Sequence, residues 1–497
     1  MVNRYNERIF SKQGRQQLFL LKLLYNSQEV IDIGTLTLKM AMDRRSVYKC
    51  IEQLKSYMEV ENLGTEIQVS AKGEYSYTGN KIDYYRLRGL IVEDEPMMQL
   101  AKLFLEERNI SLMEFCAHHF ISESTFKRYV GKANTVLKLL GIRICIKKDE
   151  VSVRGNEASI RYCLVSFFWR AYHGVIWPFK NINEIHVQHT ISNLLLYSER
   201  VSYGKKTQFS FFLAVYILRA QAGHTIDKKE LPAYFEALVY SNPIFEVFSV
   251  KFAERFPLEK KELGFIYLTL FIFPDSYLYI QNTSDTLEIL TRQGYESYSS
   301  IKNFVSFIKE KHPEFDITDP QKKDFVAMLI AGRIFIDIFE NIYFNSSAIA
   351  IFTYTEKNFP HLFPSIQEGI KKYNPNLSLN NLKALTLRYT QAYVMEFSPR
   401  DFEPEIRILV DTDIPMYADK IMLNRLDSLL GPKFNYKWIK GEEKMLPDLL
   451  LSTGQAADKF SKTPTVYLNA EVSPKDKDAI VKMCEKIVEE KQIQIKK

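Results

Sequence analysis

The sequence predicts a mainly α-helical, multidomain protein that ends in a small α/β domain. At 497 residues, the chain exceeds the roughly 250–300 residues that one hydrophobic core organises, so we expect about two to four domains. Apolar residues recur at helical spacing along most of the chain, which is typical of amphipathic helices. From Pro404 onward, short apolar runs alternate with helical patterns, and this predicts a domain of strands and helices.

The composition is that of an ordinary globular protein, with 46% hydrophobic and 25% charged residues. The longest apolar run, residues 263–273, is shorter than the about 20 residues that a membrane-spanning helix needs. No export signal is evident near the N-terminus. The cysteines form no CxxC pair, so we expect reduced, mostly buried thiols. We therefore expect a cytoplasmic protein with no membrane partner, cofactor or metal.

Residues 1–92 carry the element order of a winged helix-turn-helix unit. Helical spacing of apolar residues predicts a first helix and then a short second helix in residues 31–42. Asp43 precedes a third helical pattern and is its expected N-cap. Two alternating apolar runs around "AKGE" follow, which is typical of a β-hairpin. The basic residues expected on the outer face of the third helix are Arg44, Arg45 and Lys49.

Residues 93–158 repeat this order. Pro96 opens a helix, Ser111 starts a second one, and Ser122 is the expected N-cap of a third. A tight hairpin follows, and it turns at Lys148. From Ser122 to Lys148 there are seven basic residues and one acidic residue, a density that suits a polyanion. The basic residues off the apolar stripe of the third helix are Lys127, Arg128 and Lys132.

The repetition of this short basic helix predicts a DNA-binding protein. A recognition helix exposes the side chains of its first turns to bases and phosphates, while its apolar back packs on a supporting helix. Both copies show this division between faces. Two purely structural helical units are the alternative interpretation. The repeat favours double-stranded DNA as the partner.

The rest of the chain predicts two helical bundles and an α/β tail. Residues 159–284 and 285–400 are the expected bundles, divided by a break in the helical pattern at residues 273–285. Their Phe- and Tyr-rich stripes indicate packed cores rather than ligand sites. Residues 401–497 contain a strand, a helix, three short strands and a final helix, which predicts a small domain with a mostly parallel sheet.

Over essentially its whole length, the chain resembles the Mga/AtxA-type virulence transcription regulators of Gram-positive bacteria. The markers are "DRRSVYKCIEQL", "SESTFKRYVGKAN" and, in the tail, "RILVDTDIPMYADKIMLNRL", "PDLLLSTG" and "TPTVYLNAEVSPKD". The tail is similar to the IIB component of sugar phosphotransferase systems. The resemblance implies that the bundles are phosphotransferase-regulation domains (PRDs). It also implies a homodimer joined through the IIB-like tail and contact with phosphocarrier proteins of that system.

In regulators of this type, histidines of the two PRD-like bundles can receive phosphate from the sugar-uptake relay. Imidazole suits reversible phosphorylation, because one ring nitrogen can attack while a partner holds the other. His189 and His224 are our candidates in the first bundle. His312 and His361 are the candidates in the second. An ordinary surface or core histidine is the alternative interpretation at each position.

The tail departs from a true IIB component at one informative point. A IIB component carries a nucleophilic Cys after its first strand, where this chain has Thr412 and Asp413. A phosphocarrier enzyme is therefore disfavoured. Walker, dinucleotide-binding and zinc-protease motifs are also missing from the sequence, so we expect no catalytic site. The remaining alternatives are an RNA-binding antiterminator with similar regulatory domains and a non-enzymatic scaffold.

Overall fold

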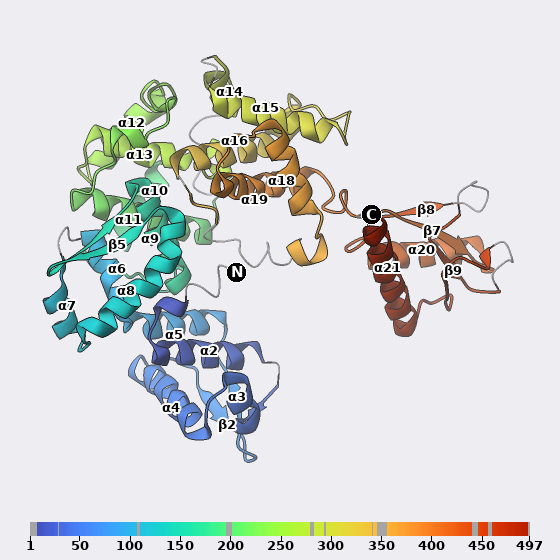
Figure 1. Cartoon of the computed structure of the whole chain (residues 1–497), viewed down its shortest axis with the longest axis horizontal. Helices are drawn as coiled ribbons and strands as arrows, with labels where there is room; N and C mark the ends of the chain where they lie inside the picture. The colour runs from blue at the N-terminus through green and yellow to red at the C-terminus, as the bar shows by residue number, and fades with distance from the viewer. Residues whose placement is uncertain are drawn as a thin grey trace. The chain divides into compact units, whose positions relative to one another are not determined.

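A computed structural model describes most of the chain and divides it into two compact units. Unit 1 contains residues 1–349 and 373–388, and unit 2 contains residues 350–372 and 389–497. Helices dominate the described residues, as predicted, and three small sheets accompany them (Figure 1). The described residues are 7–27, 29–106, 110–194, 201–278, 283–292, 295–339, 341–344, 355–439, 446–455 and 460–495.

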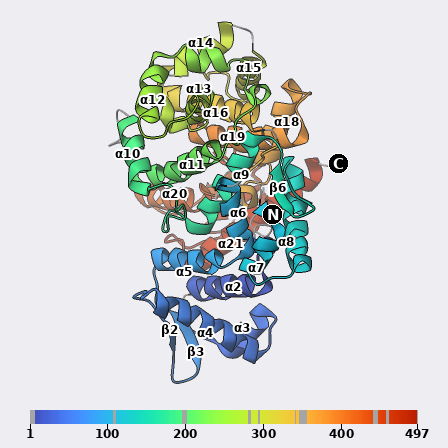
Figure 2. The same cartoon turned by 90° about the vertical axis from the view of Figure 1, so that its left-hand side faces the viewer.

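Residues 12–77, here called the first head, form three helices followed by a hairpin, as predicted. The elements are α2 (Lys12–Asn26), β1 (Ile31–Asp32), α3 (Ile33–Met40), α4 (Arg44–Val60), β2 (Ile67–Val69) and β3 (Glu74–Tyr77). One side chain from each helix, Leu21, Leu36 and Leu54, is fully buried in the core. The short strand β1 was not predicted; it pairs antiparallel with β3, in the order β1-β3-β2. Figure 2 shows the hairpin beside α4.

Residues 96–154, here called the second head, repeat this arrangement. The elements are α6 (Pro96–Glu106), β4 (Ile110–Ser111), α7 (Leu112–His118), α8 (Glu123–Leu137), η2 (Lys138–Leu140), β5 (Arg143–Lys147) and β6 (Glu150–Arg154). Three aromatic side chains, Phe104, Phe115 and Phe126, share one core with the strands. The sheet is antiparallel, in the order β4-β6-β5. The predicted hairpin around Lys148 is confirmed.

A helix that was not predicted, α5 (Lys81–Glu93), connects the two heads. The Asn80 side chain accepts hydrogen bonds from the backbone N–H groups of Ile82 and Asp83, and the Asp83 carboxylate accepts one from the Asn80 N–H. This reciprocal pair is a capping box, which satisfies backbone donors that a helix start leaves free. The spacing of Asn80 and Asp83 was therefore a sequence signal for this helix.

Glu95, between α5 and α6, joins the second head to the start of the first. Its carboxylate accepts hydrogen bonds from the backbone N–H and the hydroxyl of Ser11, at 2.6 and 2.7 Å. Gly14 makes room for this contact, because a Cβ there would lie only 1.8 Å from Glu95 Oε1. Burial raises the pKa of Glu95, although the bonds from Ser11 act in the opposite direction.

The middle of the chain is helical, as predicted. Its helices are α9 (Glu157–Tyr172), α10 (Glu184–Leu194), α11 (Tyr203–Gln221), α12 (Pro243–Ala253), α13 (Lys260–Leu270), α14 (Thr283–Arg292), α15 (Glu296–Lys309), α16 (Lys323–Ile338), α18 (Leu362–Tyr373) and α19 (Leu379–Glu396). The aromatic stripes lie in cores, also as predicted. Phe212 stacks on Tyr216 with 4.1 Å between the ring centroids, and the ring centroids of Tyr216 and Phe265 are 5.7 Å apart. Of the predicted break at residues 273–285, residues 279–282 lie outside the described chain.

The tail in unit 2 forms the predicted parallel sheet. Its elements are β7 (Ile406–Asp411), α20 (Met416–Leu430), β8 (Tyr436–Ile439), β9 (Leu449–Ser452), β10 (Thr465–Tyr467) and α21 (Pro474–Ile495). The strand order is β10-β9-β7-β8, and every pair is parallel. Asp448 holds the start of β9 in place, because Arg407 and Lys491 both donate hydrogen bonds to its carboxylate. Burial alone would raise the pKa of Asp448, but these donors hold it at about 2.

None of the helices in the described part of the chain has the length and apolar character needed to cross a membrane. Within the same residues, His, Cys, Asp and Glu side chains form no cluster that could hold a metal ion. All five cysteines are free, and Cys50, Cys116 and Cys484 are buried.

Candidate nucleic-acid interface

Helix α4 presents basic side chains at its start and buries its opposite face. The Asp43 carboxylate caps the helix by accepting from the Ser46 backbone N–H at 3.0 Å and from the Ser46 hydroxyl at 2.7 Å. The residues that face the core are Val47, Cys50, Ile51 and Leu54. The residues exposed to solvent are Arg44, Arg45 and Lys49. The predicted cap and both predicted faces of this helix are therefore confirmed.

Helix α8 has the same design. The Ser122 hydroxyl caps it by accepting from the Thr125 backbone N–H at 3.2 Å. Lys127 and Arg128 are exposed, whereas Lys132 is half-buried. Lys127 also forms an ion pair with Glu123 at 2.8 Å, but both side chains are about half exposed, and such surface pairs break at little cost. Phosphate could therefore replace Glu123 as the partner of Lys127.

The two heads match each other landmark by landmark. The caps Asp32 and Asp43 of α3 and α4 recur 79 residues later as Ser111 and Ser122, the caps of α7 and α8. The left-handed turn that follows α3 in the first head recurs 79 residues later, after α7 in the second head. It is formed by Ala41, with φ of 50°, in the first head and by Phe120, with φ of 51°, in the second. Equal spacing of caps and turns indicates two copies of one structural unit.

Phe120 is a landmark that the sequence pattern did not predict. Its side chain is 96% exposed, although a Phe after an amphipathic helix suggests a core residue. The left-handed turn directs it away from the core, next to the first turn of α8. An aromatic side chain at this position can contact a deoxyribose or a thymine methyl group.

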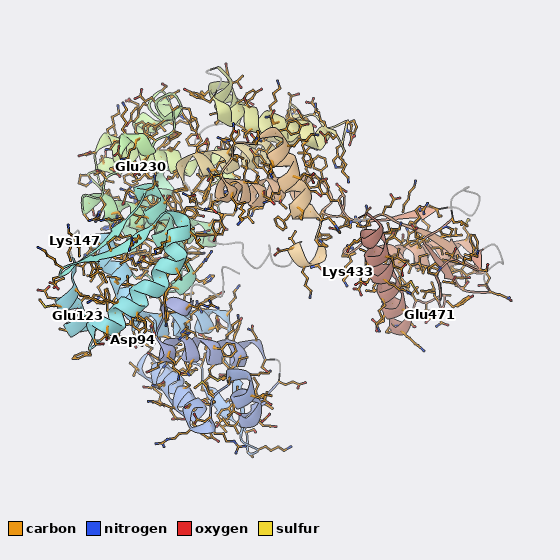
Figure 3. All side chains as sticks on the ribbon, viewed as in Figure 1. Asp94, Glu123, Lys147, Glu230, Lys433 and Glu471 are labelled. Atoms are coloured by element: carbon orange, nitrogen blue, oxygen red, sulfur yellow. The ribbon has the colours of Figure 1, made fainter. Side chains whose placement is uncertain are left out.

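The β-hairpins β2–β3 and β5–β6, here called the first and second wings, carry further exposed cations at their tips. Lys72 lies at the tip between β2 and β3, and Lys147 and Lys148 lie at the tip between β5 and β6. Lys148 has a φ of 55°, which is the left-handed conformation that closes this two-residue turn. Glu123 and Lys147, both labelled in Figure 3, come from α8 and from the second wing. Wing-tip cations are placed to contact phosphates beside a groove.

A fourth basic residue, Arg15, comes from a distant part of the sequence and interacts electrostatically with Lys132 of α8. Burial, followed by repulsion from Arg15 and Arg128, lowers the pKa of Lys132. Arg15 lies in the first turn of α2, so helical periodicity alone could not have assigned it to this cluster. Polyanion binding would relieve repulsion among these cations.

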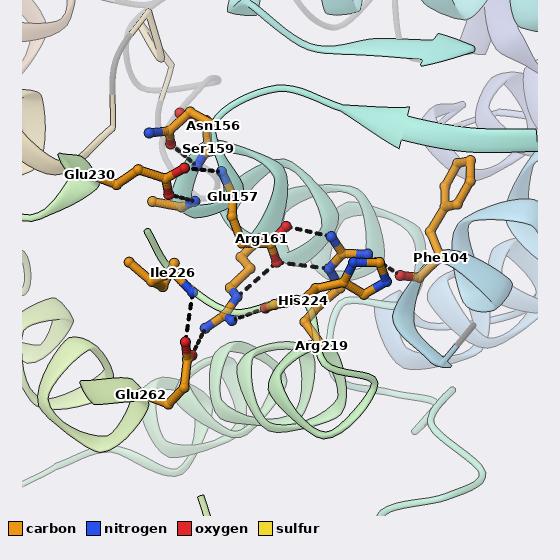
Figure 4. A network of polar contacts seen from close by, with 11 residues as sticks. Phe104, Asn156, Glu157, Ser159, Arg161, Arg219, His224, Ile226, Glu230 and Glu262 are labelled. Atoms are coloured by element: carbon orange, nitrogen blue, oxygen red, sulfur yellow. Dashed lines mark hydrogen bonds and ion pairs between the residues drawn. The ribbon is translucent and has the colours of Figure 1, made fainter. Parts of the chain in front are cut away.

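Behind the second head, a buried ion network connects it to the first helices of the middle region (Figure 4). Arg219 donates to both oxygens of the Glu157 carboxylate, at 2.9 and 2.5 Å, and to the backbone carbonyl of Phe104 in α6 at 2.5 Å. Arg161 contacts Glu157 at 3.0 Å and forms an ion pair with Glu262 at 2.8 Å. Both arginine side chains are at most 1% exposed. Two carboxylates thus balance two guanidinium groups away from water.

A capped basic helix followed by a β-hairpin is the arrangement of a winged helix-turn-helix domain. Residues 80–168 match the family model of the Mga helix-turn-helix domain. The Mga match begins at the cap of α5 and ends within α9, so it contains the whole second head. It is consistent with a Mga-type regulator, and a helix-turn-helix domain indicates DNA binding. No curated protein matches the chain.

The candidate histidines lie in the middle region, each with its own neighbours. His189, on α10, is exposed, and Arg255 Nη1 lies 3.0 Å from its Nδ1. The backbone carbonyl of His224 accepts from Arg161 at 2.6 Å. His312 Nδ1 lies 3.9 Å from the Glu314 carboxylate. His361 Nδ1 lies 2.7 Å from Glu403 Oε2.

Proposed function

We propose that the chain is a DNA-binding transcriptional regulator that contacts duplex DNA with both heads. The observation that carries the proposal is the structural repeat. Helices α4 and α8 are both capped, bury an apolar face and expose cations on their first turns. Each follows a shorter helix that begins at a capping residue and ends in a left-handed turn. The match to the Mga helix-turn-helix domain supports the second copy directly. The contact residues are Arg44, Arg45, Lys49, Lys127, Arg128 and Lys132.

A gel shift with duplex DNA from the region upstream of the protein's own gene tests this function. We expect a retarded complex that excess double-stranded RNA of equal length fails to displace. The competitor separates the proposal from the main alternative, an RNA-binding antiterminator, because α-helices fit the major groove of B-DNA but not the deep, narrow groove of RNA. Displacement by RNA at equal concentration would favour the antiterminator.

We further propose that the regulator is a homodimer joined through its IIB-like tail. Helix α20 carries three exposed apolar residues at its start: Met416 at 88%, Tyr417 at 73% and Ile421 at 52% exposure. Tyr417 and Ile421 are one helical turn apart and therefore share a face. A two-fold dimer would place two pairs of heads on paired DNA half-sites, and linked heads bind more tightly than separate ones.

Charged residues on this face are expected to separate the dimer. We predict that Tyr417→Lys combined with Ile421→Lys halves the mass measured by light scattering, and that deletion from Pro404 onward leaves the mass of one shortened chain. The matched control is Val247→Lys with Val250→Lys, an exposed apolar pair on α12 at 56% and 63% exposure. The control should keep the wild-type mass. A particle of two chains after both tail changes, two full-length chains for the double variant and two shortened chains for the deletion, would contradict the dimer interface.

Phosphorylation of histidines by the sugar relay is the regulatory part of the proposal. In unit 2, the Glu403 carboxylate holds His361 Nδ1 and leaves Nε2 as the nitrogen that can attack phosphorus. In unit 1, Arg255 next to His189 could stabilise a phosphoryl group, which carries roughly −1.5 to −2 charges. The loop of a IIB nucleophile instead holds Asp413, which accepts from the Thr453 hydroxyl at 2.6 Å.

Labelled phosphoenolpyruvate with the general relay proteins tests this regulation. We expect acid-labile, base-stable label that falls when His189, His224, His312 or His361 is replaced by Ala. His118→Ala, in the second head, is the matched control, and Cys484→Ala should also leave the label unchanged because Cys484 is buried in α21. Absence of label on every candidate, with a labelled relay protein in the same tube, would refute this part alone.

A further inference from the structure

An apolar cavity of about 370 Å³ lies within unit 1, behind helix α8. Ala133, Val136 and Leu137 of α8 form part of its wall, on the side of the helix opposite to Lys127 and Arg128. The other walls come from α6, the second wing, α9, residues 343–344 and Lys383 of α19. Its volume lies at the lower end of the roughly 300–1,000 Å³ that small-molecule sites occupy.

Two basic residues of the cavity lining, Arg170 and Lys383, lie beside neighbouring aromatic rings. The Arg170 guanidinium lies 5.1 Å from the centre of the Phe344 ring, and the Lys383 ammonium lies 5.7 Å from the centre of the Tyr343 ring. The two rings are themselves 6.4 Å apart, so both cations are near the same pair of aromatic side chains. None of the described residues that line the cavity is an aspartate or a glutamate. This cationic part of the lining is therefore suited to an anion.

Ser166 provides a second, independent sign of a ligand. It lines the cavity one helical turn before Arg170, and it is only 3% exposed. Its hydroxyl has no hydrogen-bond partner among the described residues. A buried hydroxyl normally has a partner, and leaving it without one costs free energy. An oxygen atom of a ligand at the cationic part of the lining would satisfy it.

Other parts of the lining are neutral and held in place. Burial raises the pKa of Cys163 to about 12, so this thiol stays uncharged at neutral pH. At the rim, the side-chain amide of Asn380 donates to the backbone carbonyl of Leu139 at 3.1 Å and to the side chain of Asn341 at 3.3 Å. These bonds tie the start of α19 to the end of the second head.

We propose that this cavity binds an amphipathic monocarboxylate, with its carboxylate at Ser166, Arg170 and Lys383 and its acyl chain against the apolar walls. The two cations offset the single negative charge, and the Ser166 hydroxyl donates to a carboxylate oxygen. The acyl chain is buried against side chains of α6 and α8. The occupant touches the back of the helix that carries Lys127 and Arg128, yet binding itself does not depend on the proposed DNA contact.

Isothermal titration of the full chain with decanoate tests the site, with decanol as the probe that lacks the charge. We expect saturable binding of decanoate at one site per chain and at least about tenfold weaker binding of decanol, since a hydrogen-bonded charge is worth at least that ratio. Lys383→Gln and Ser166→Ala should each weaken decanoate and leave decanol unchanged. Val136→Phe, which fills the cavity from its rim, should weaken both probes.

Lys205→Gln is the matched control for charge, because Lys205 is an exposed lysine in α11. Thermal unfolding of each variant confirms that the fold is retained. The proposal is overturned if wild-type protein gives no binding heat with decanoate, or if decanoate and decanol bind equally. It is also overturned if Lys383→Gln, Ser166→Ala and Val136→Phe all bind decanoate as wild type does.

Discussion

Replacing Arg161 with Ala is expected to lower the free energy of unfolding of unit 1 by about 3–5 kcal/mol, the cost of removing one partner from a buried ion pair. Arg161 contacts both Glu157 and Glu262, and its side chain is fully buried. Without it, Glu262 loses its guanidinium partner while remaining 1% exposed. Arg219 would still neutralise Glu157, so most of the loss arises at Glu262.

Urea denaturation followed by tryptophan fluorescence measures this loss. Trp169 and Trp177 pack against Phe211 in unit 1, with ring centroids 5.5 and 5.4 Å apart. Trp438 is the third tryptophan of the chain, so in a Trp438→Phe background the fluorescence reports on unit 1 alone. The matched control is Lys205→Ala, which removes an exposed ion pair with Asp275. The control should leave the unfolding midpoint unchanged. Equal midpoints for Arg161→Ala and the control would show that the network does not stabilise the fold.

The second large effect concerns DNA affinity. Arg44→Ala with Arg45→Ala is expected to weaken duplex DNA binding about 30-fold at 0.15 M salt, because each phosphate contact then contributes roughly fivefold by counterion release. Lys127→Ala with Arg128→Ala should have an effect of the same order. The substituted side chains are exposed and lie off the buried face of α4 or α8, so the fold should be retained.

Fluorescence anisotropy with labelled duplex measures both affinities. Lys228→Ala with Lys229→Ala is the matched control, since these adjacent lysines are exposed in a short 3₁₀ helix outside both heads. The control removes the same net charge and should lose much less affinity. A similar loss in all three double variants would mean that overall charge, and not the two helices, determines binding.

The parts of the fold that could be predicted depend on local signals. Caps such as Asp43 and Ser122 mark helix starts within a few residues, so α4 and α8 could be located from sequence. Helix α5 was missed although Asn80 and Asp83 form a capping box, because its apolar residues show little amphipathic pattern. The two-residue strand β1 was missed because so short a segment has no recognisable period.

Contacts between distant segments could not be predicted from local patterns. The network of Glu157, Arg161 and Arg219 joins α9 to α11, and a single sequence gives no sign of such partners. The same holds for Glu403 beside His361 and for Arg255 beside His189. The exposed Phe120 depends on one left-handed turn, which sequence periodicity does not reveal. Tertiary contacts thus determine how the candidate residues are held.

The salt dependence of DNA binding tests the central claim most directly. We would measure the logarithm of the association constant against the logarithm of salt concentration for wild type and for the variant that combines Arg44→Ala, Arg45→Ala, Lys127→Ala and Arg128→Ala. The slope is expected to become shallower by about four, or roughly 0.9 for each phosphate contact removed. A slope equal to that of wild type would contradict the claim that both heads contact DNA through these residues.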